Sequence, residues 1–501
     1  MADAVPAPVG SSRSPGSDPL PFNVVKVVLV SLVAVTLFRL WFITRLQLFP
    51  DEAYYWLWSK NLALSYRDKG PLVAWLIALG TKLFGDIPFG IRVFAVLCLS
   101  ATSWILFSFA RRLFDDRTAL WCFALVILIP LFAAEAIIMT IDPMSILSWA
   151  WGLSLFWTAI HSGKIWDWIG LGVVIGLGFL AKFTNGVQLV SIALFLLWSG
   201  PHRKYFFSRQ SILMCVAFCV TISPLLWWNY ETGWVHAMAL SSRSGAEGSF
   251  GIHPDEFFQF VGGQFLVLSP LLGLGMLVAV LGLARRKHDD ARIRLLLTQL
   301  IPLVGIFLFF SLNKAGKENW TAPALLAGIV LLVVFWRDFA AHSPRWRLLV
   351  MPAIVLMLMM TVLGHNTDIL RLNGERDPLR TAKGWDVFAE HIQQAREKHA
   401  TTVLIGHRYQ EASMMSYYLP DHPTTYLPRE KYGSSQFSLW PYFNPTNHPR
   451  ALYVTMVRRR EPFLPLELLQ DYPKCEPVDE FWSKHQGRPM QRFRIYLCTR
   501  P

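Results

Sequence analysis

The sequence FPDEAYYW at residues 49–56 follows the apolar run Leu29–Ile43 and places the adjacent carboxylates of Asp51 and Glu52 just beyond that run. The same segment continues to YRDKGP at residues 66–71, which adds one acid and two cations. Charged groups at a membrane boundary are costly unless they face water, a partner or a bound molecule. The segment therefore predicts a site where a polar substrate meets a lipid.

The composition is typical of a membrane protein. Hydrophobic residues make up 53% and charged residues 16% of the 501 residues, whereas soluble proteins carry roughly 25% charged residues. Apolar runs of about 20 residues match a hydrocarbon layer about 30 Å thick. We therefore predict a polytopic α-helical membrane protein with about 11 transmembrane helices, counted from the apolar runs. The predicted spans are Val24–Ile43, Ile87–Phe109, Ala119–Met139, Pro143–Ile160, Trp166–Phe183, Gly186–Ser199, Ser211–Trp228, Phe260–Leu283, Ile293–Leu312, Ala322–Phe339 and Leu348–Leu363. The sixth of these is short, which favours a partly re-entrant segment.

The loops predict the orientation. With a cytoplasmic N-terminus, one side of the membrane receives most of the loop cations, as the positive-inside rule requires. These cations are Arg111, Arg112, Arg117, Lys164, Arg203, Lys204, Arg209, Arg285, Arg286, Lys287, Arg292, Arg337, Arg345 and Arg347. Short loops on the opposite side hold few cations beyond Arg243, Lys314 and Lys317. Asp51, Asp142 and the C-terminal region then lie on the non-cytoplasmic side.

The formal net charge is 47 − 34 = +13. Cytoplasmic loops and the C-terminal region carry much of it, and cations there meet anionic lipid headgroups. A nucleic-acid partner is therefore not expected.

Composition divides the chain into three parts. Residues 1–22 are rich in Pro, Ser and Gly, which is typical of a disordered tail. Residues 23–364 hold the apolar runs, with a first external loop at 44–86. Residues 365–501 alternate polar and short apolar segments, and we expect a small extracytoplasmic α/β domain there.

The expected elements of the C-terminal domain follow from its apolar spacing. Strands are predicted over Thr402–Ile405, Ala451–Val454 and Phe493–Leu497, and a helix over Trp385–His399. Cys475 and Cys498 share this domain, so an oxidising compartment would permit a disulfide between them.

Several blocks resemble a known family. They are PDEAYY at 50–55, YRDKGP at 66–71, DPM at 142–144, GLGFLAK at 176–182, NWTAP at 319–323 and QFSLW at 436–440. The chain resembles the polyprenyl-phosphate-sugar-dependent glycosyltransferases of the GT-C superfamily, and within it the branch of lipid A aminoarabinose transferases and bacterial relatives of protein mannosyltransferases. The resemblance covers nearly the whole chain in order. It implies a GT-C catalytic domain over residues 23–364.

The resemblance also implies which residues act. Sugar transfer from a lipid phosphate to a hydroxyl needs a base for the hydroxyl proton and cations for the departing phosphate. By analogy with the family, Asp51 is the base, while Glu52 orients the loop or caps the following helix. Asp142 matches the second acidic position, although an acid before Pro143 is also a common helix start. Glu135, two helical turns earlier, is either a supporting acid or a water-facing one.

Cations of the same blocks are candidates for the donor phosphate. Lys69 matches the lysine that the family uses near the carrier phosphate, and Arg67 and Tyr66 flank it as contact candidates. Lys182 follows an apolar run, where an unpaired ammonium is costly. Its alternative is a side chain that extends to the interface.

Other polar residues outside the membrane are weaker candidates. Lys314, Lys317 and Glu318 lie beside the NWTAP block, and Arg243 lies in a Ser- and Gly-rich loop that is typical of a mobile lid. The acid of the YRDKGP block is associated with a divalent metal in some relatives, so Asp68 with His253 or His236 forms a candidate metal site. Two histidines without a tight spacing favour surface or substrate contacts over metal binding.

These features predict an inverting glycosyltransferase of a bacterial inner membrane with a periplasmic active site and a periplasmic C-terminal domain. The expected donor is a sugar on undecaprenyl phosphate or a similar lipid, and the expected acceptor is lipid A, lipopolysaccharide or another envelope glycan. One alternative is a protein O-glycosyltransferase or mannosyltransferase. The others are a lipid or sugar transporter or flippase and a non-catalytic scaffold. The sugar, the acceptor, the metal requirement and the oligomeric state are not fixed by the sequence.

Overall fold

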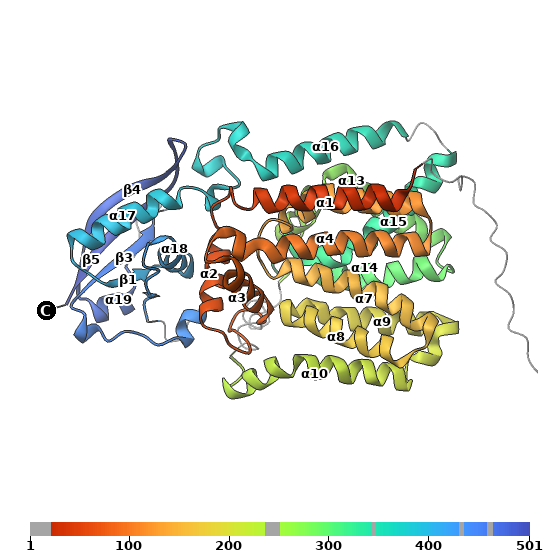
Figure 1. Cartoon of the computed structure of the whole chain (residues 1–501), viewed down its shortest axis with the longest axis horizontal. Coiled ribbons are helices and arrows are strands. Elements are labelled where there is room, and N and C mark those ends of the chain that lie inside the picture. Colours follow the sequence, from red (N-terminus) through yellow and green to blue (C-terminus); the bar gives the residue numbers. More distant parts are fainter. Residues whose placement is uncertain (1–21, 236–250, 343–346, 430–434, 458–463, 501) are drawn as a thin grey trace, which may run out of the picture.

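A computed structural model describes residues 22–235, 251–342, 347–429, 435–457 and 464–500. A helical part forms most of the molecule, and a sheet domain lies at one end of it (Figure 1). Two short helices, α2 (Pro50–Lys60) and α3 (Leu72–Phe84), lie between the two parts. Residues 44–86, predicted as the first external loop, therefore lie at the junction between the helices and the sheet domain.

The helical part contains a series of apolar helices that lie roughly parallel in Figure 1. In addition to α2 and α3 they are α1 (Val24–Phe42), α4 (Pro88–Leu113), α5 (Asp116–Leu128), α6 (Pro130–Glu135), α7 (Asp142–Ser162), α8 (Ile165–Ala181), α9 (Val187–Trp198), α10 (Arg209–Glu231), α12 (Pro254–Leu268), α13 (Pro270–Arg286), α14 (Ala291–Ser311), α15 (Ala322–His342) and α16 (Arg347–His365).

Five helices in the described part of the chain are long and apolar enough to cross a membrane, or six when a bent pair counts as one span. The five are α1, α4, α10, α14 and the segment Glu318–Phe339, which includes most of α15. The fold is therefore a helical membrane protein with a C-terminal sheet domain. The count of about eleven crossings stays a prediction.

Proline breaks two of the predicted spans. The run Ala119–Met139 divides into α5 and α6 at Pro130, and Phe260–Leu283 forms parts of α12 and α13, which meet at 105° before Pro270. The residue before a proline is disfavoured in the helical region, and Ile129 and Ser269 have ψ values of 127° and 130°. Each of these two predicted spans therefore corresponds to two helices in the structure.

The predicted sixth span is short in the structure as well. A 3₁₀ turn at Phe183–Gly186 precedes α9, which has 12 residues. At 1.5 Å per residue this helix is about 18 Å long, against a hydrocarbon thickness of about 30 Å.

The sheet domain has five strands in the order β2-β1-β3-β5-β4. They are β1 (Val403–Gly406), β2 (Thr425–Tyr426), β3 (Arg450–Met456), β4 (Lys474–His485) and β5 (Arg488–Thr499). β1 pairs in parallel with β2 and β3, whereas β3, β5 and β4 are antiparallel neighbours. α17 (Trp385–Lys398) and α18 (Tyr409–Tyr418) belong to the same domain, with the short α19 (Leu466–Asp471).

The predicted strands lie in β1, β3 and β5, and the predicted helix is α17, so these expectations are confirmed. Cys475 and Cys498 face each other across β4 and β5 and form a disulfide. The sequence analysis did not identify β4, because its residues are mostly exposed or half-buried and lack a continuous apolar run.

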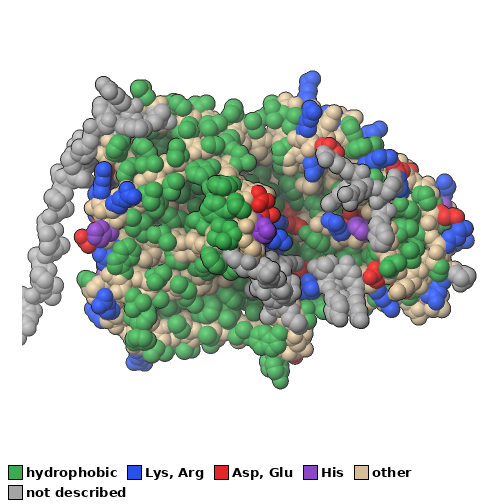
Figure 2. Space-filling model, turned by 180° about the vertical axis from the view of Figure 1, so that it is seen from behind, with side chains coloured by type: hydrophobic (Ala, Val, Ile, Leu, Met, Phe, Trp, Pro, Cys, Tyr) green, Lys and Arg blue, Asp and Glu red, His purple; other side chains and the backbone are tan. Residues whose placement is uncertain are grey.

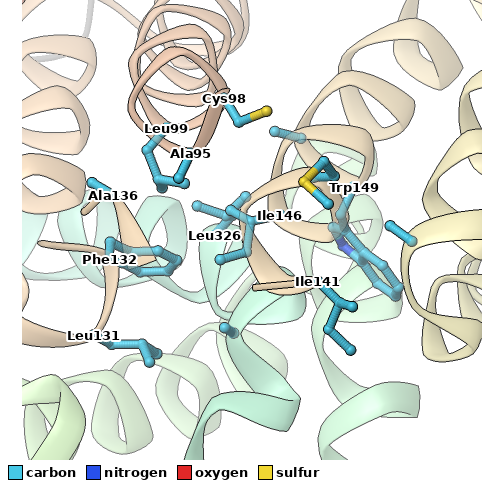
Figure 3. Packing of buried hydrophobic residues seen from close by; sticks show 14 of the residues in the cluster. Ala95, Cys98, Leu99, Leu131, Phe132, Ala136, Ile141, Ile146, Trp149 and Leu326 are labelled. Carbon is cyan, nitrogen blue, oxygen red and sulfur yellow. The ribbon is translucent and has the colours of Figure 1, made fainter. Parts of the chain in front are cut away.

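A buried apolar cluster connects the helices that surround the candidate site. Figure 3 shows Leu99 of α4, Phe132 of α6 and Leu326 of α15 beside Ile141 and Trp149. All five side chains are at most 5% exposed. This packing fixes the start of α7, where Asp142 lies.

Candidate active site

A buried ion pair holds α2 in place. Arg92 of α4 donates from Nε to Oε1 of Glu52 at 2.7 Å and from Nη2 to Oε2 at 2.5 Å, and both side chains are fully buried. Glu52 also accepts hydrogen bonds from the backbone amides of Phe49 and Met139, both at 2.9 Å. Its carboxylate therefore caps α2 and connects this helix to the segment that precedes Asp142.

Arg92 also fixes the turn between α1 and α2. Its Nη1 atom donates to the carbonyls of Ile43 and Leu46 at 3.0 and 2.9 Å, and its Nη2 atom donates to that of Gln47 at 2.9 Å. A buried guanidinium with this many acceptors is satisfied in charge and in hydrogen bonding. The position of α2 against α4 is thus set by one charged network.

Asp51 lies one residue before Glu52, and its carboxylate contacts the sheet domain. The hydroxyl of Tyr409, the first residue of α18, donates to Oδ1 of Asp51 at 2.8 Å. The Tyr409 ring packs against Tyr54, with ring centroids 4.5 Å apart. The candidate base is therefore bonded to a residue 358 positions away in the chain.

The YRDKGP loop packs between α2 and the sheet domain. Oδ2 of Asp68 accepts a hydrogen bond from the hydroxyl of Tyr54 at 2.8 Å, and Oδ1 lies 3.5 Å from Nη1 of Arg67. The side-chain oxygen Oε1 of Gln436 accepts from the backbone amide of Arg67 at 2.7 Å. The backbone amide of Gln436 donates to the hydroxyl oxygen of Tyr54 at 2.6 Å. Phe437 stacks on Tyr54 with an interplanar angle of 2°. The QFSLW block thus binds directly to the YRDKGP loop.

Tyr66 supports the loop from inside. Its ring is fully buried and stacks on Trp58 with centroids 4.3 Å apart. Its hydroxyl lies 3.0 and 3.2 Å from the carbonyls of Trp58 and Asn61 and accepts from the Ala63 amide at 3.2 Å. Burial raises the pKa of Tyr66 to about 12, which keeps the phenol protonated.

The loop also packs closely on the end of α8. A side-chain carbon at Gly70 would lie 1.9 Å from the carbonyl oxygen of Leu180, so only glycine permits this approach. Lys69 precedes Gly70, and Lys182 comes two residues after Leu180. The two lysines predicted to bind the donor phosphate are therefore carried by segments in direct contact.

A second charged cluster lies at the start of α7. Lys182 Nζ donates to Oδ1 of Asp142 at 2.6 Å, and Asn319 Nδ2 donates to Oδ2 at 2.9 Å. Thr140 lies within hydrogen-bond distance of Asp142 and of Glu135, at 3.3 and 3.2 Å, and Asn319 reaches Glu135 at 3.3 Å. Asp142, Lys182 and Glu135 are 3, 7 and 8% exposed. The cluster contains two carboxylates and one ammonium.

Tyr55 lies between the two clusters. Burial raises the pKa of this phenol well above its ordinary value, and the nearby negative charges of Asp51, Asp142 and Asp68 raise it further. Asp51 lies on α2, Asp68 is bonded to Tyr54 of the same helix, and Glu52 accepts from the Met139 amide, three residues before Asp142. The structure therefore places Asp51, Asp68 and Asp142 near the N-terminal half of α2.

Other predicted contact residues lie at the edge of this arrangement. Lys314 and Lys317 are exposed, and Glu318 is half-buried, with its backbone carbonyl bound to Gln264 at 3.0 Å. Asn319 follows directly and belongs to the second cluster. Arg243 lies outside the described residues.

The candidate metal site gains no support from the geometry. Both carboxylate oxygens of Asp68 contact protein groups, while His253 is exposed and bonds through its amide to the Leu312 carbonyl at 2.7 Å. His236 lies outside the described residues. Within the described ranges, no group of three or more His, Cys, Asp and Glu residues is arranged to hold a metal ion.

A cavity of about 1210 Å³ lies on another face of α2. It is lined by Trp56 and Lys60 of α2 and by aromatic residues of the sheet domain, including Tyr426, Trp440 and Tyr442. At 100° per residue, Trp56 and Lys60 lie about 140° and 180° around the helix from Asp51. The cavity is therefore separate from the cluster of carboxylates. In the space-filling view the surface is hollowed between the helical part and the sheet domain (Figure 2).

The sequence analysis missed several residues of the site. Arg92 had a signal, since a lone arginine in an apolar run needs a partner. Asn319 and Gln436 lie in blocks that carried the family resemblance, and Tyr55 lies in another. Tyr409 had none, because its contact with Asp51 depends on how the two parts of the chain dock.

Comparisons with known proteins find similarity to glycosyltransferases of the kind that the sequence blocks resemble. A model of the family described as dolichyl-phosphate-mannose-protein mannosyltransferase matches residues 68–228. The lipid A galacturonosyltransferase RgtD of Rhizobium johnstonii is 28% identical over 312 residues, which cover 60% of this chain and 64% of the relative. The undecaprenyl phosphate-alpha-4-amino-4-deoxy-L-arabinose arabinosyl transferase of Pseudomonas aeruginosa is 27% identical over 316 residues, covering 56% of this chain and 54% of the relative. The chain thus spans between half and two thirds of the length of these relatives.

Solved structures show the same fold. ArnT from Cupriavidus metallidurans in the apo state has a TM-score of 0.64 at 16% identity, covering 95% of this chain and 98% of ArnT. ArnT bound to undecaprenyl phosphate has a TM-score of 0.63 at 16% identity, covering 93% and 97%. An oligosaccharyltransferase from Archaeoglobus fulgidus, tethered with an acceptor peptide, has a TM-score of 0.54 at 12% identity, covering 80% of this chain and 64% of that one.

The resemblance predicted from the sequence blocks is confirmed. The chain is similar in sequence to a lipid A galacturonosyltransferase and to an undecaprenyl phosphate-aminoarabinose arabinosyl transferase, and it has the fold of ArnT.

Proposed function

We propose that this chain, a relative of the lipid A sugar transferases with an ArnT-type fold, moves a sugar from a polyprenyl phosphate to lipid A or a related envelope glycan. The observation that carries the proposal is the group of charged residues around α2: Asp51 lies on the helix, Asp68 is bonded to Tyr54, and the bond from Met139 to Glu52 brings the Asp142–Lys182 pair toward the same helix. Carboxylates and an ammonium in one partly buried site are what a base and a phosphate-binding group require.

Asp51 acts as the base in this proposal. Its carboxylate takes the proton of the acceptor hydroxyl while the hydroxyl oxygen attacks the anomeric carbon. The new glycosidic bond forms as the bond from the anomeric carbon to the phosphate oxygen breaks, and the electron pair leaves with the polyprenyl phosphate. Attack from the face opposite to the phosphate inverts the anomeric configuration.

The cations stabilise the leaving phosphate. Lys69 and Lys182 lie on segments that meet where Gly70 contacts Leu180, and Arg67 belongs to the same loop. Lys182 is bonded to Asp142 at 2.6 Å, so it shares its charge between that carboxylate and the incoming phosphate. Asp142 and Glu135 would then orient Lys182 and the sugar ring. Lys314, Lys317 and Glu318 are at the edge of the site, where they would contact the donor.

The proposed topology has eleven crossings, a cytoplasmic N-terminus and an active site on the periplasmic face of a bacterial inner membrane. The distribution of loop cations supports this orientation. Figure 2 agrees with it, since Lys and Arg side chains gather at the end of the helical part that is remote from the sheet domain. The proposed domains are a cytoplasmic tail at 1–22, the catalytic domain at 23–364 and the periplasmic α/β domain at 365–501.

A protein acceptor is the second candidate, because the matching family model describes protein mannosyltransferases. The two candidates differ in the product and not in the chemistry at the anomeric carbon. The name of one relative, the lipid A galacturonosyltransferase, favours lipid A.

Mass spectrometry of the modified acceptor tests the proposal. The chain and its Asp51→Asn variant are produced in a bacterium whose lipid A lacks added sugars, and both lipid A and membrane proteins are analysed. We expect a sugar-sized mass increase on lipid A with the parent chain and none with the variant. The same increase on proteins alone would favour the second candidate. Unmodified lipid and protein in a strain that makes the polyprenyl phosphate donors would contradict both.

A further inference from the structure

We propose that Tyr409 is a positioning residue for Asp51, so that the sheet domain completes the reaction centre. This inference rests on the proposed function, in which Asp51 is the base. It assigns a chemical role to the C-terminal domain beyond covering the site.

The contact is direct. The Tyr409 hydroxyl donates to Oδ1 of Asp51 at 2.8 Å. Both residues are half-buried, so the bond is partly shielded from water. Hydrogen bonds to a charged acceptor are about twice as strong as those between neutral groups. The bond fixes one carboxylate oxygen and leaves the other, Oδ2, to accept the proton of the acceptor hydroxyl.

The contacts between α18 and β1 hold Tyr409 in position. It is the first residue of α18 and follows β1, which lies between β2 and β3 in the sheet. A side-chain carbon at Gly406 would lie 2.5 Å from the Ala412 amide, so strand and helix are in close contact. Glu411 accepts from the Arg408 amide at 3.1 Å and caps the helix. The close packing of β1 and α18 therefore fixes the direction of the Tyr409 hydroxyl.

The place of Tyr409 in the sheet also suits a functional residue. After β1 the chain continues to β2, on one side of β1, whereas after β3 it continues to β4, on the opposite side of the sheet order. The direction in which strands are added therefore reverses between β1 and β3, at their carboxyl ends. In open α/β sheets such reversals are where binding and reacting groups are usually placed. Tyr409 follows the carboxyl end of β1 by three residues.

Further hydrogen bonds hold the domain in register with α2. The Leu48 amide donates at 2.8 Å to the hydroxyl oxygen of Tyr418, at the other end of α18. The Trp385 amide donates to the side chain of Gln47 at 2.8 Å. Both contacts lie within four residues of Asp51 along the chain. They fix the separation between α18 and the candidate base without touching its carboxylate.

Tyr409→Phe, with Tyr418→Phe as its matched control, separates a chemical role from a docking role. Each variant removes one hydroxyl from α18, and only Tyr409 touches Asp51. The assay measures transfer to lipid A by the full chain in detergent micelles between pH 4 and 9, after thermal unfolding has been compared for the three proteins.

Loss of the bond has a defined expected result. A hydrogen bond from a phenol favours the charged carboxylate, so Tyr409→Phe should shift the acidic limb of kcat/KM to higher pH. On that limb we expect kcat about tenfold lower, with the donor KM changed by less than about twofold. Tyr418→Phe should leave the position of the limb unchanged.

A second variant at the same position keeps the tyrosine's shape. Fluorotyrosine at position 409 has a more acidic hydroxyl, which donates more strongly, so the acidic limb should move to lower pH. Opposite shifts for phenylalanine and fluorotyrosine cannot arise from loosened docking. This variant also decides the matter if Tyr409→Phe unfolds at a lower temperature than the parent.

The outcomes distinguish the two proposals. If Asp51→Asn abolishes transfer and neither variant at 409 moves the limb, the role of Tyr409 is overturned while the proposed function stands. If Asp51→Asn transfers sugar at the parental rate, the base assignment fails and the positioning role fails with it.

Discussion

Glu52 is surrounded by more fixed donors than its neighbour Asp51. It receives two hydrogen bonds from Arg92 and two from backbone amides, and it is fully buried. This environment is that of a structural carboxylate, because no oxygen is left exposed to a substrate. Asp51 has one hydroxyl partner that the structure records and is half-buried. Adjacent acids in one sequence block thus have different surroundings.

Substitution of Glu52 by Gln should destabilise the fold. The change leaves the buried Arg92 charge without its carboxylate, which typically costs roughly 3–5 kcal/mol. Thermal unfolding in detergent should therefore begin well below the parental temperature. Asp116→Asn, which breaks an exposed pair with Arg111, is the control and should change the free energy of unfolding by less than about 1 kcal/mol. Equal midpoints for the parent and Glu52→Gln would contradict the structural role.

Lys182 is predicted to serve the donor phosphate as well as Asp142. Lys182→Met should lower the transfer rate about a hundredfold, as is common for loss of one charge-stabilising donor. The double variant Lys182→Met with Asp142→Asn removes both charges of the pair, and the two effects are compared in a mutant cycle. We expect the double variant to stay as slow as Lys182→Met. Recovery of transfer would mean that Lys182 only neutralises Asp142.

At the scale of elements, the segment that leads from α16 to α17 is held by a charged cluster. Lys383 Nζ lies 2.7 Å from Asp368 and 2.8 Å from Asp377, and Asp368 also pairs with His485 and Arg488 of the β4–β5 hairpin. Burial alone would raise the pKa of each carboxyl, but the hydrogen bonds from Lys383 and the other partners outweigh it and lower both pKa values.

This cluster predicts acid sensitivity at the start of the sheet domain. Because both folded-state pKa values lie below the unfolded value of roughly 3.9, the stabilisation is fully present above about pH 4 and is lost as pH falls through the folded values. Hydrogen exchange at residues 366–384 should accelerate below about pH 4, before that of β1 and β3. Asp368→Asn should remove part of this acid dependence. Uniform exchange rates across the domain from pH 3 to 6, after correction for intrinsic chemistry, would exclude the cluster as their cause.

Elements were predicted well where apolar periodicity alone decides them. The runs that became α1, α4 and α14, and the strands β1, β3 and β5, have continuous apolar patterns. The breaks at Pro130 and Pro270 were not predictable from hydropathy alone. Apolar content carries no information on the backbone restriction of the residue before a proline. β4 was missed because its stability comes from its pairing with β5.

At the scale of the whole molecule, two distant parts of the chain meet at one site. Asp51, Asp68 and Asp142 could be named as candidates from the sequence, since three of the motif blocks carry an acid. Arg92 and Tyr409 were not predicted as partners of these acids, because their hydrogen bonds to Glu52 and Asp51, across 40 and 358 positions, depend on the docking of helices and sheet. The motif blocks therefore provide the candidate acids, and tertiary packing determines which of them is fully enclosed by protein donors.

Gln436 tests whether the docking of the two parts matters for the donor. Its side chain accepts from the Arg67 amide at 2.7 Å and so connects the sheet domain to the loop that carries Lys69. Gln436→Ala should loosen that loop and raise the donor KM by about tenfold, the equivalent of roughly 1.4 kcal/mol of binding. Gln470→Ala, on the wall of the separate cavity, is the control for a glutamine lost from the same domain. An unchanged donor KM in Gln436→Ala would show that this contact does not organise the loop.

Asp51 is proposed as the base in the transfer of a sugar from a lipid phosphate. In the most direct measurement, the purified chain is mixed with lipid A and with polyprenyl phosphate-linked sugars, including galacturonic acid and 4-amino-4-deoxy-arabinose. The amounts of glycosylated lipid A and of released polyprenyl phosphate are both measured. The account predicts equal amounts of the two products from the parent chain with one of the donors, and neither product from a folded Asp51→Asn variant. Equal turnover by the parent and by Asp51→Asn would contradict it.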